Sequence, residues 1–259
     1  MTNKEYREHE GISKSSLWEI NKSPLHFKYK MDNPREDTQA LLFGRAIHKY
    51  ILESDTFFNE FAICPQIDRR SKSGKEEYDN FIQLSNGKDI ITQSDFDIIL
   101  EMKKSIDSLT DVVELLKGDY EQSYFWTDQI TGEKCKCRPD VINHKNKLIV
   151  DLKTTDSCED NHFEWSCKKY GYKLQAGMYC EGIFQNTFDE YGFKFIAIEK
   201  KQPYAVRIYN CTPEYINQGY DKFRELLGIY HECKIKNEWK GYDRIEAREV
   251  DLLADDYID

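Results

Sequence analysis

Asp140, Asp151 and Lys153 are the residues whose types and spacing best suit a chemical reaction, and they lie in the segment CKCRPDVINHKNKLIVDLKTT. Carboxylates hold hard divalent cations through oxygen, and such cations stabilise the attacking and leaving oxygens of a phosphodiester displacement. A lysine beside them can orient or activate the attacking water. The alternative is an Asp–Lys pair on a solvated hairpin, and because short patterns recur by chance, these residues alone leave both interpretations open.

The surrounding pattern predicts a β-hairpin that positions these side chains. Apolar runs at 141–142 and 148–150 flank the polar turn 144–146, which is typical of two antiparallel strands. Side chains two residues apart share one face of a strand, so Asp151 and Lys153 point to the same side near the strand's end. The earlier aspartate lies on the partner strand, within reach of that face.

Composition limits the class of protein. The chain has 259 residues, of which 39% are hydrophobic, enough for one large domain or two small ones. No apolar run approaches the length of a membrane span, and the polar N-terminus carries no secretory-signal pattern. The eight scattered cysteines then predict reduced thiols and a cytoplasmic protein without a membrane partner. The net charge of −10 argues against a general nucleic-acid coat, but basic patches and bound cations still permit a nucleic-acid enzyme.

Periodicity predicts one domain with a helical part over about 11–119, a core over 120–233 and an acidic tail over 234–259. Residues 1–10 are charged and predicted to be loose. Residues 120–128 are predicted to form one strand, which makes a three-stranded antiparallel meander with the hairpin. Helices are expected to begin at Ser13 and at Ser23-Pro24 and to cover about 38–53, 75–86, 94–107 (N-cap Ser94), 159–170, 172–184 and 212–233, with further strands at about 61–64, 191–200 and 204–211.

Gly44 and His48 lie four residues apart and share one face of the predicted helix 38–53. A glycine in a helix interior costs about 1 kcal/mol against alanine, so Gly44 is predicted to mark a close approach of another backbone. An isolated histidine here would be read as a satisfied side chain between helices.

The segment 68–75, DRRSKSGK, is the most basic in the chain. Arg69, Arg70 and Lys72 are predicted to lie on a surface loop. They either face solvent or contact the phosphates of a nucleic acid.

Five separated motifs together resemble the PD-(D/E)XK nuclease superfamily. They read ISKSSL with a following SP, GRAIH, CRPD, VDLKTT and KYGYKLQAGMY, in that order over about residues 11–230. More closely, they resemble phage recombination exonucleases of the exonuclease VIII (RecE) type, with λ exonuclease and the RecB nuclease domain as more distant relatives. The resemblance implies an α/β fold: a restriction-endonuclease-like core with a small mixed β-sheet flanked by helices.

The resemblance also implies roles for individual residues. Asp140 and Asp151 resemble the metal-binding carboxylates, the Leu152 carbonyl completes a metal shell, and Lys153 resembles the catalytic lysine. His48 is similar to the histidine that adds a ligand to the second metal. Asp151 stands where many members of the superfamily have glutamate, one methylene longer.

Two further groups follow from the same resemblance. Gln175 and Tyr179, one helical turn apart, resemble the motif that supports the site or touches DNA beside it. Ser13, Ser15 and Arg138 are expected to form a pocket for a 5′-phosphate, because λ-like relatives hold that group with arginine and serine. The alternative is that both serines cap a helix and the arginine pairs with a surface carboxylate.

The implied activity is that of a Mg²⁺-dependent exodeoxyribonuclease, with Mn²⁺ as a substitute. It would degrade one strand of linear duplex DNA from the 5′ end and expose a 3′ overhang for a single-strand annealing protein (RecT-like). The relatives imply a ring-shaped homo-oligomer, a trimer or tetramer, encoded by a phage or prophage. The alternatives are another PD-(D/E)XK endonuclease or repair nuclease, and a DNA-binding module that has lost catalysis.

A competing metal site would use cysteine, since some RecB-like relatives hold an iron–sulfur cluster with four cysteines. The chain has Cys135 and Cys137 in a C-x-C pattern, with Cys158, Cys167 and Cys180 later. It has no C-x-x-C pair, so neither a cluster nor a zinc site is expected.

Overall fold

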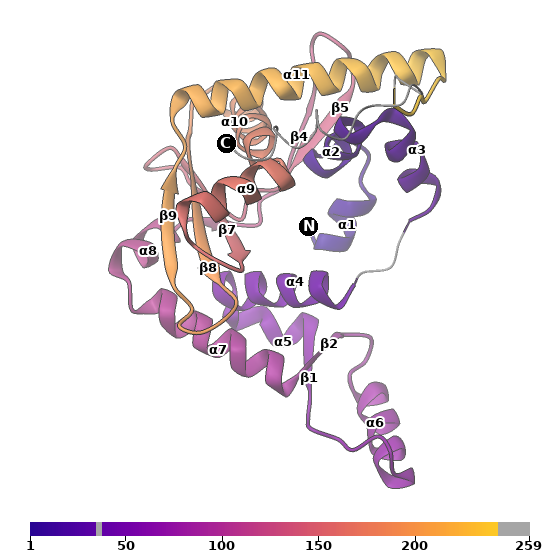
Figure 1. Ribbon diagram of the computed structural model, residues 1–259, viewed down its shortest axis with the longest axis vertical. Helices are drawn as coiled ribbons and strands as arrows, with labels where there is room; N and C mark the ends of the chain where they lie inside the picture. The colour runs from indigo at the N-terminus through magenta and orange to yellow at the C-terminus, as the bar shows by residue number, and fades with distance from the viewer. Residues whose placement is uncertain (35–37, 243–259) are drawn as a thin grey trace, which may run out of the picture.

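A five-stranded mixed sheet forms the centre of the protein in the computed structural model, which describes residues 1–34 and 38–242 (Figure 1). Within this sheet β7 and β8 run parallel, and all other neighbours run antiparallel. The predicted α/β class with a small mixed sheet is therefore confirmed. The strand order is β3 (Asp119–Tyr120), β6 (Val141–Asn143), β7 (Leu148–Thr155), β8 (Gly192–Glu199) and β9 (Val206–Asn210).

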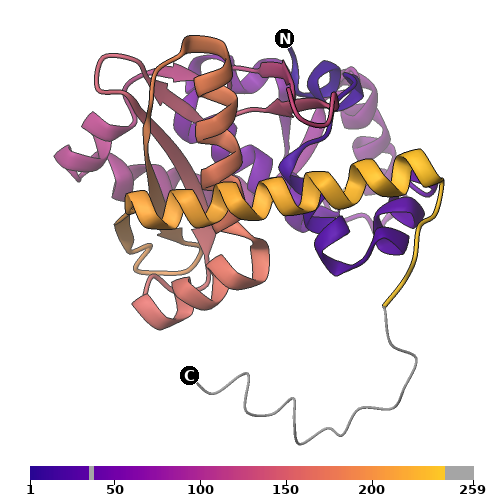
Figure 2. The same ribbon diagram turned by 90° about the horizontal axis from the view of Figure 1, so that it is seen from above.

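Three helices cover one face of this sheet. α9 (Asp160–Tyr170) and α10 (Tyr172–Thr187) cross over between the parallel strands β7 and β8, as a parallel pair requires. α11 (Pro213–Lys236) follows β9 and packs along α10 (Figures 1 and 2). Ile149 of β7 lies in the apolar cluster on this face.

The opposite face is covered by the N-terminal helices α4 (Gln39–Leu52), α7 (Gln93–Asp107) and α8 (Thr110–Leu115). Their apolar side chains pack against Val150 and Leu152 of β7. Strand β7 is thus buried on both faces, which places its polar residues in a low-dielectric environment.

The predicted three-stranded meander is wrong in one respect, because residues 120–128 do not form one strand. Glu121 has a left-handed backbone, with φ +50°, and this turns the chain out of the central sheet after β3. The continuation, β4 (Tyr124–Thr127), pairs with β5 (Lys134–Cys137) in a separate two-stranded sheet. The hairpin of β6 and β7 is confirmed, with Val141 opposite Val150.

Two predictions at helix ends are also wrong. Residues 1–10 are not loose but contain α1 (Asn3–Glu8), which Thr2 and Glu5 close with a reciprocal capping box. Helix α7 is capped by Thr92 and not by Ser94, because Asp95 completes a capping box with Thr92. The remaining elements are α2 (Lys14–Lys22), α3 (Pro24–Asp32), η1 (Ser54–Thr56), α5 (Phe57–Glu60), β1 (Phe61–Cys64), α6 (Lys72–Leu84) and β2 (Asp89–Thr92).

Part of the predicted tail lies outside the described residues, which end at Tyr242. Over the described ranges, no helix combines the length and apolar character that crossing a membrane requires.

The predicted close approach of a backbone at Gly44 is wrong, because an added Cβ there would meet nothing within 4 Å. Other glycines do mark such a contact. The contact occurs between α10 and α11. A Cβ on Gly219 would lie 2.0 Å from the carbonyl oxygen of Lys173, and one on Gly177 would lie 2.1 Å from the backbone nitrogen of Tyr220. These glycines allow α11 to hold α10, and therefore Gln175, against the sheet.

We predict that Gly219→Ala lowers the free energy of unfolding by about 3 kcal/mol or more, because the new methyl group forces the two helices apart. Gly228→Ala is the matched control on the same helix, where an added Cβ meets nothing within 4 Å. It should raise stability by about 0.5–1 kcal/mol. Urea denaturation of both variants checks this, and equal effects would contradict the account.

Buried ion pairs attach the β4–β5 hairpin to α11. Asp128 is 5% exposed and accepts hydrogen bonds from Arg224 of α11 and from Thr131. Burial alone would raise the pKa of Asp128, but the Arg224 guanidinium and Thr131 hold it below its ordinary value of 3.8. The ionised carboxylate therefore stabilises the folded state.

Asp128→Asn should cost about 2 kcal/mol of stability at neutral pH, because it removes charged hydrogen bonds to Arg224. A lowered folded-state pKa contributes stability above the unfolded value and loses it as pH falls through the folded value. The penalty should therefore shrink below pH 3.8, the ordinary pKa of the group. Thermal melts across pH check this, with exposed Glu77→Gln as control; a penalty independent of pH would contradict it.

Candidate active site

Strand β7 brings Asp151 and Lys153 together, as their spacing predicts. Asp151 is 1% exposed, and its Oδ1 forms an ion pair with the Lys153 ammonium. Gln175 on α10 contacts both residues: its Nε2 donates to Asp151 Oδ2, and its Oε1 accepts from Lys153 Nζ at 2.9 Å. The glutamine amide thus fixes the carboxylate and the ammonium relative to each other.

Asp140 lies just before β6, and the backbone of β7 holds its side chain. The Leu152 N–H donates to Asp140 Oδ2 at 2.7 Å, and His48 Nδ1 on α4 lies 3.3 Å from the same oxygen. The hairpin register places Asp140 beside the centre of β7, where it faces Asp151. Asp140, Asp151, Lys153, Gln175 and His48 are therefore brought together from four separate segments.

Glu121 is a member of the site that sequence reasoning missed. One ligand atom each from His48, Glu121 and Asp140 lies within 4.8 Å of the others, and this is the only such group of three or more in the described part of the chain. The backbone N–H of Glu121 donates to the Asp140 carbonyl at 3.1 Å. The sequence prediction placed Glu121 inside a continuous strand and therefore did not propose it as a site residue. The signal that could have identified it is an acidic residue shortly before the aromatic run SYFW.

The acidic side chains raise one another's proton affinity. Burial and the nearby Asp140 charge raise the pKa of Asp151 to about 6, and burial with Asp140 raises the pKa of Glu121 to about 7. Burial would also raise the pKa of Asp140, but His48 and Lys153 hold it below its ordinary value. Burial would lower the pKa of His48, which Asp140 instead raises. At Asp151 and Glu121, burial and the Asp140 charge therefore outweigh the nearby cations.

The donor set fits a hard divalent cation. Carboxylate oxygens and one imidazole nitrogen converge, and Asp151 Oδ1 accepts no hydrogen bond of normal geometry beside its ion pair with Lys153. A dication among these groups would offset the burial cost and the repulsion that raise the pKa values of Asp151 and Glu121. Oxygen-rich sites with one histidine suit Mg²⁺ or Mn²⁺ better than softer metals.

Tyr179 lies one turn after Gln175 and is half-buried. Its ring contacts Phe193 of β8, with a centroid separation of 6.4 Å. Burial raises the pKa of its phenol well above the ordinary value. Tyr179 thus packs beside the site residues, and among the described residues no hydrogen bond joins its phenol to Asp151, Lys153 or Gln175.

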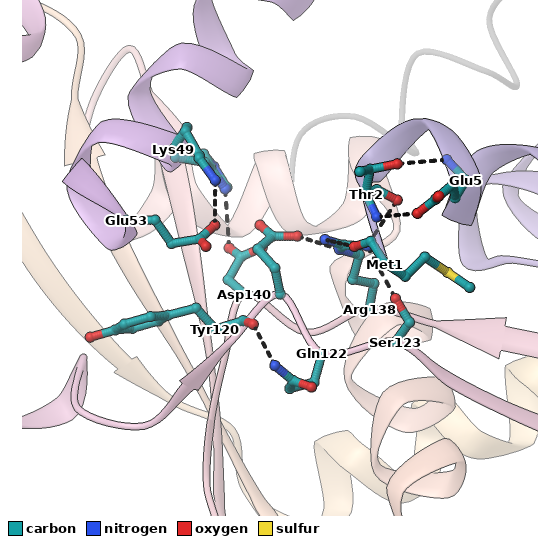
Figure 3. A network of polar contacts seen from close by, with 12 residues as sticks. Met1, Thr2, Glu5, Lys49, Glu53, Tyr120, Gln122, Ser123, Arg138 and Asp140 are labelled. Carbon is teal, nitrogen blue, oxygen red and sulfur yellow. Dashed lines mark hydrogen bonds and ion pairs between the residues drawn. The ribbon is translucent and has the colours of Figure 1, made fainter. Parts of the chain in front are cut away.

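The three residues expected to hold a 5′-phosphate have separate hydrogen-bond partners. Arg138 Nε donates to Glu121 Oε2 at 2.7 Å, and Nη1 donates to Ser123 Oγ and to the Met1 and Thr2 carbonyls (Figure 3). Arg138 directly follows β5, whereas Asp140 directly precedes β6, so the two residues do not share a strand. The Arg138 guanidinium therefore has its hydrogen-bond partners in the acidic cluster, at Ser123 and in the N-terminal segment.

Ser13 is the N-cap of α2: its hydroxyl accepts from the Ser16 N–H at 3.3 Å and lies 2.9 Å from the Ser15 hydroxyl. No hydrogen bond joins Arg138 to either Ser13 or Ser15 in the described part of the chain.

The basic segment lies apart from the carboxylates. Arg69 and Arg70 precede α6, Lys72 is its first residue, and α6 projects away from the central sheet (Figure 1). The guanidinium carbon of Arg69 lies 4.6 Å from the centre of the Tyr78 ring on α6. The cysteines, all free, contribute no ligand group in the described residues.

The fold and the site define the class of protein. A mixed sheet whose central hairpin carries Asp140, Asp151 and Lys153 is the arrangement expected of a PD-(D/E)XK nuclease. The family model described as a PDDEXK-like domain of unknown function (DUF3799) matches residues 13–249. The chain therefore belongs to that family, and the predicted superfamily is confirmed.

Two solved structures are similar to the chain, and the first supports this fold. A crystal structure from Eubacterium rectale, named as a candidate exonuclease, is similar with a TM-score of 0.67 and 16% identity, covering 100% of this chain and 98% of the other. A phage-related exonuclease from Haemophilus somnus 129PT has a TM-score of 0.39 and 13% identity, covering 89% and 98%. At these identities the first likeness shows the fold alone. No curated protein matches the chain.

We predict that Mn²⁺ and Ca²⁺ stabilise the protein, because a cation that binds only the folded state adds about 2.7 kcal/mol at a hundred times its Kd. Asp140→Ala and Asp151→Ala should abolish the rise in melting temperature, and Glu121→Gln should reduce it. Differential scanning calorimetry measures the effect, with Glu77→Gln as the control carboxylate. An undiminished rise in the Asp151 variant would contradict a metal site here.

Proposed function

We propose that this protein is a Mg²⁺-dependent exodeoxyribonuclease that degrades one strand of linear duplex DNA in the 5′-to-3′ direction. The observation that carries the proposal is the convergence of Asp140, Asp151 and Lys153, held by Gln175. The exposed 3′ overhang would serve a single-strand annealing protein in recombination. The resemblance to phage enzymes further supports a ring-shaped oligomer working in a bacterial cytoplasm.

Each residue has a proposed task. Asp140 and Asp151 hold the cation, and His48 and Glu121 are further ligands that lie within reach of Asp140. The Leu152 carbonyl is a ligand that the resemblance implies. When bound, Mg²⁺ supplies electrophilic stabilisation of the phosphodiester oxygens.

Lys153 orients the attacking water and offsets the charge that develops on the phosphate. Burial would lower the pKa of Lys153, but Asp151 raises it, so the side chain stays cationic. It therefore acts as a fixed positive charge. Gln175 positions Lys153 without itself touching the reacting atoms.

The decisive experiment is digestion of linear duplex labelled separately at the 5′ and the 3′ end, with Mg²⁺ and with Ca²⁺. We expect early release of 5′-terminal nucleotides with Mg²⁺ and none with Ca²⁺, whose looser coordination misplaces the attacking water. Relaxed circular DNA should remain intact. Cleavage of the circle would indicate an endonuclease, and release from the 3′ label first would reverse the polarity.

Lys153→Ala should still fold and bind metal but lose activity by roughly a hundredfold or more, since it removes a charge that acts mainly in the transition state. Single-turnover digestion gives the rate, and calorimetric Mn²⁺ titration gives the metal affinity. Lys153→Arg is the control that keeps the charge. If Lys153→Ala fails to fold, or folds and digests DNA at the wild-type rate, the lysine has no catalytic task and the assigned role is wrong.

A further inference from the structure

The C-terminal end of α9 is attached to α2 by side chains that satisfy its last carbonyls. Trp18 Nε1 donates to the Lys169 carbonyl at 3.2 Å, and Lys14 Nζ donates to the Tyr170 carbonyl. Gly171 ends the helix with φ +66°, and a Cβ at that position would lie 2.4 Å from the Trp18 ring. The end of α9 is therefore held rigidly by α2.

This rigid end presents exposed aromatic rings beside lysines. Trp165 is 48% exposed and Tyr170 is 46% exposed, an unusual exposure for two large rings on one short helix. Lys169 Nζ lies 4.3 Å from the Trp165 ring centre and 5.3 Å from that of Tyr170. We call Lys14, Trp165, Lys169 and Tyr170 the aromatic ledge.

The ledge is continuous with the active site. The rings of Tyr170 and Tyr172 stack with centroids 5.9 Å apart and planes 28° apart. Lys153 Nζ lies 4.6 Å from the Tyr172 ring centre, and Lys14 Nζ lies 5.9 Å from the same centre. Tyr172 thus connects the lysine proposed for catalysis to the ledge, and Figure 1 shows α9 beside β7 and α2.

Lys14 is a partly buried amine close to a second ammonium group, that of Lys153. Within the described residues its polar partner is the Tyr170 carbonyl, and no carboxylate lies within ion-pair distance. Burial and the neighbouring Lys153 lower the pKa of Lys14 to about 7. An anion at this position would stabilise both ammonium groups.

We propose that the aromatic ledge binds an unpaired stretch of the DNA strand next to the nucleotide under attack. Lys14 contacts a backbone phosphate, and Tyr170 and Trp165 stack on successive bases. The inference rests on the proposed nuclease function. A single strand fits better than a duplex, because a base stacks on a side-chain ring only when it is free of its neighbours in the double helix.

The test is binding of a fluorescein-labelled oligothymidylate to the full chain in EDTA, measured by fluorescence anisotropy. Trp165→Ala and Tyr170→Ala should each weaken binding by roughly tenfold, because stacking of one base on an aromatic ring contributes on that scale. Trp165→Phe and Tyr170→Phe should retain most of the affinity. Tyr29→Ala, at another exposed aromatic residue, is the control and should bind as the wild type does.

Two outcomes would overturn the inference: unchanged affinity in both alanine variants, or an equal loss for a blunt hairpin duplex, which would mean general electrostatic binding. The variants also separate this inference from the proposed function. If the wild type binds the oligonucleotide through the ledge but does not digest linear duplex, the nuclease proposal fails and the ledge stands. If digestion is normal and the alanine variants bind normally, the ledge is wrong and the nuclease proposal stands.

Discussion

Burial of the Asp151 carboxylate beside Lys153 is the interaction on which the rest of the structure depends. An isolated charge in such a position would be very unfavourable, and a partner with satisfied hydrogen bonds is required to offset its desolvation. Here the Lys153 ammonium provides the charge and Gln175 completes the contacts of both groups. The site therefore requires α10 at a fixed distance from β7, and the close contact of Gly177 and Gly219 between α10 and α11 maintains that distance.

The same arrangement leaves the site unbalanced in charge. Burial, together with the nearby Asp140 charge, raises the pKa values of Asp151 and Glu121. Arg138 and His48 reduce the repulsion from the outer side of the cluster. A bound dication would offset the cost of burying these carboxylates together.

Sequence reasoning predicted those features that local rules control. The spacing of Asp151 and Lys153 along one strand fixed their common face, and the apolar runs around residues 144–146 gave the hairpin that brings Asp140 to them. His48 and Gln175 lie far away in sequence, and the resemblance of their motifs, not periodicity, predicted their convergence. Their roles in catalysis and metal binding remain predictions.

The errors arise where tertiary context overrides a local pattern. Glu121 stands in a run that favours a strand, yet its left-handed backbone divides β3 from β4 and adds a third acid to the site. Gly44 was expected to mark a tight helix contact, whereas the tight contact occurs at Gly177 and Gly219. Both features depend on segments that are distant in sequence. The tight contact at Gly177 and Gly219 depends on how α10 packs against α11, and the role of Glu121 depends on the positions of His48 and Asp140.

The most direct test of this account is the position of a bound cation. A crystal of the protein soaked in Mn²⁺ and measured at the manganese absorption edge should show an anomalous peak in contact with the carboxylates of Asp140 and Asp151. A peak at the Cys135–Cys137 segment, or none at the two aspartates at saturating Mn²⁺, would contradict it.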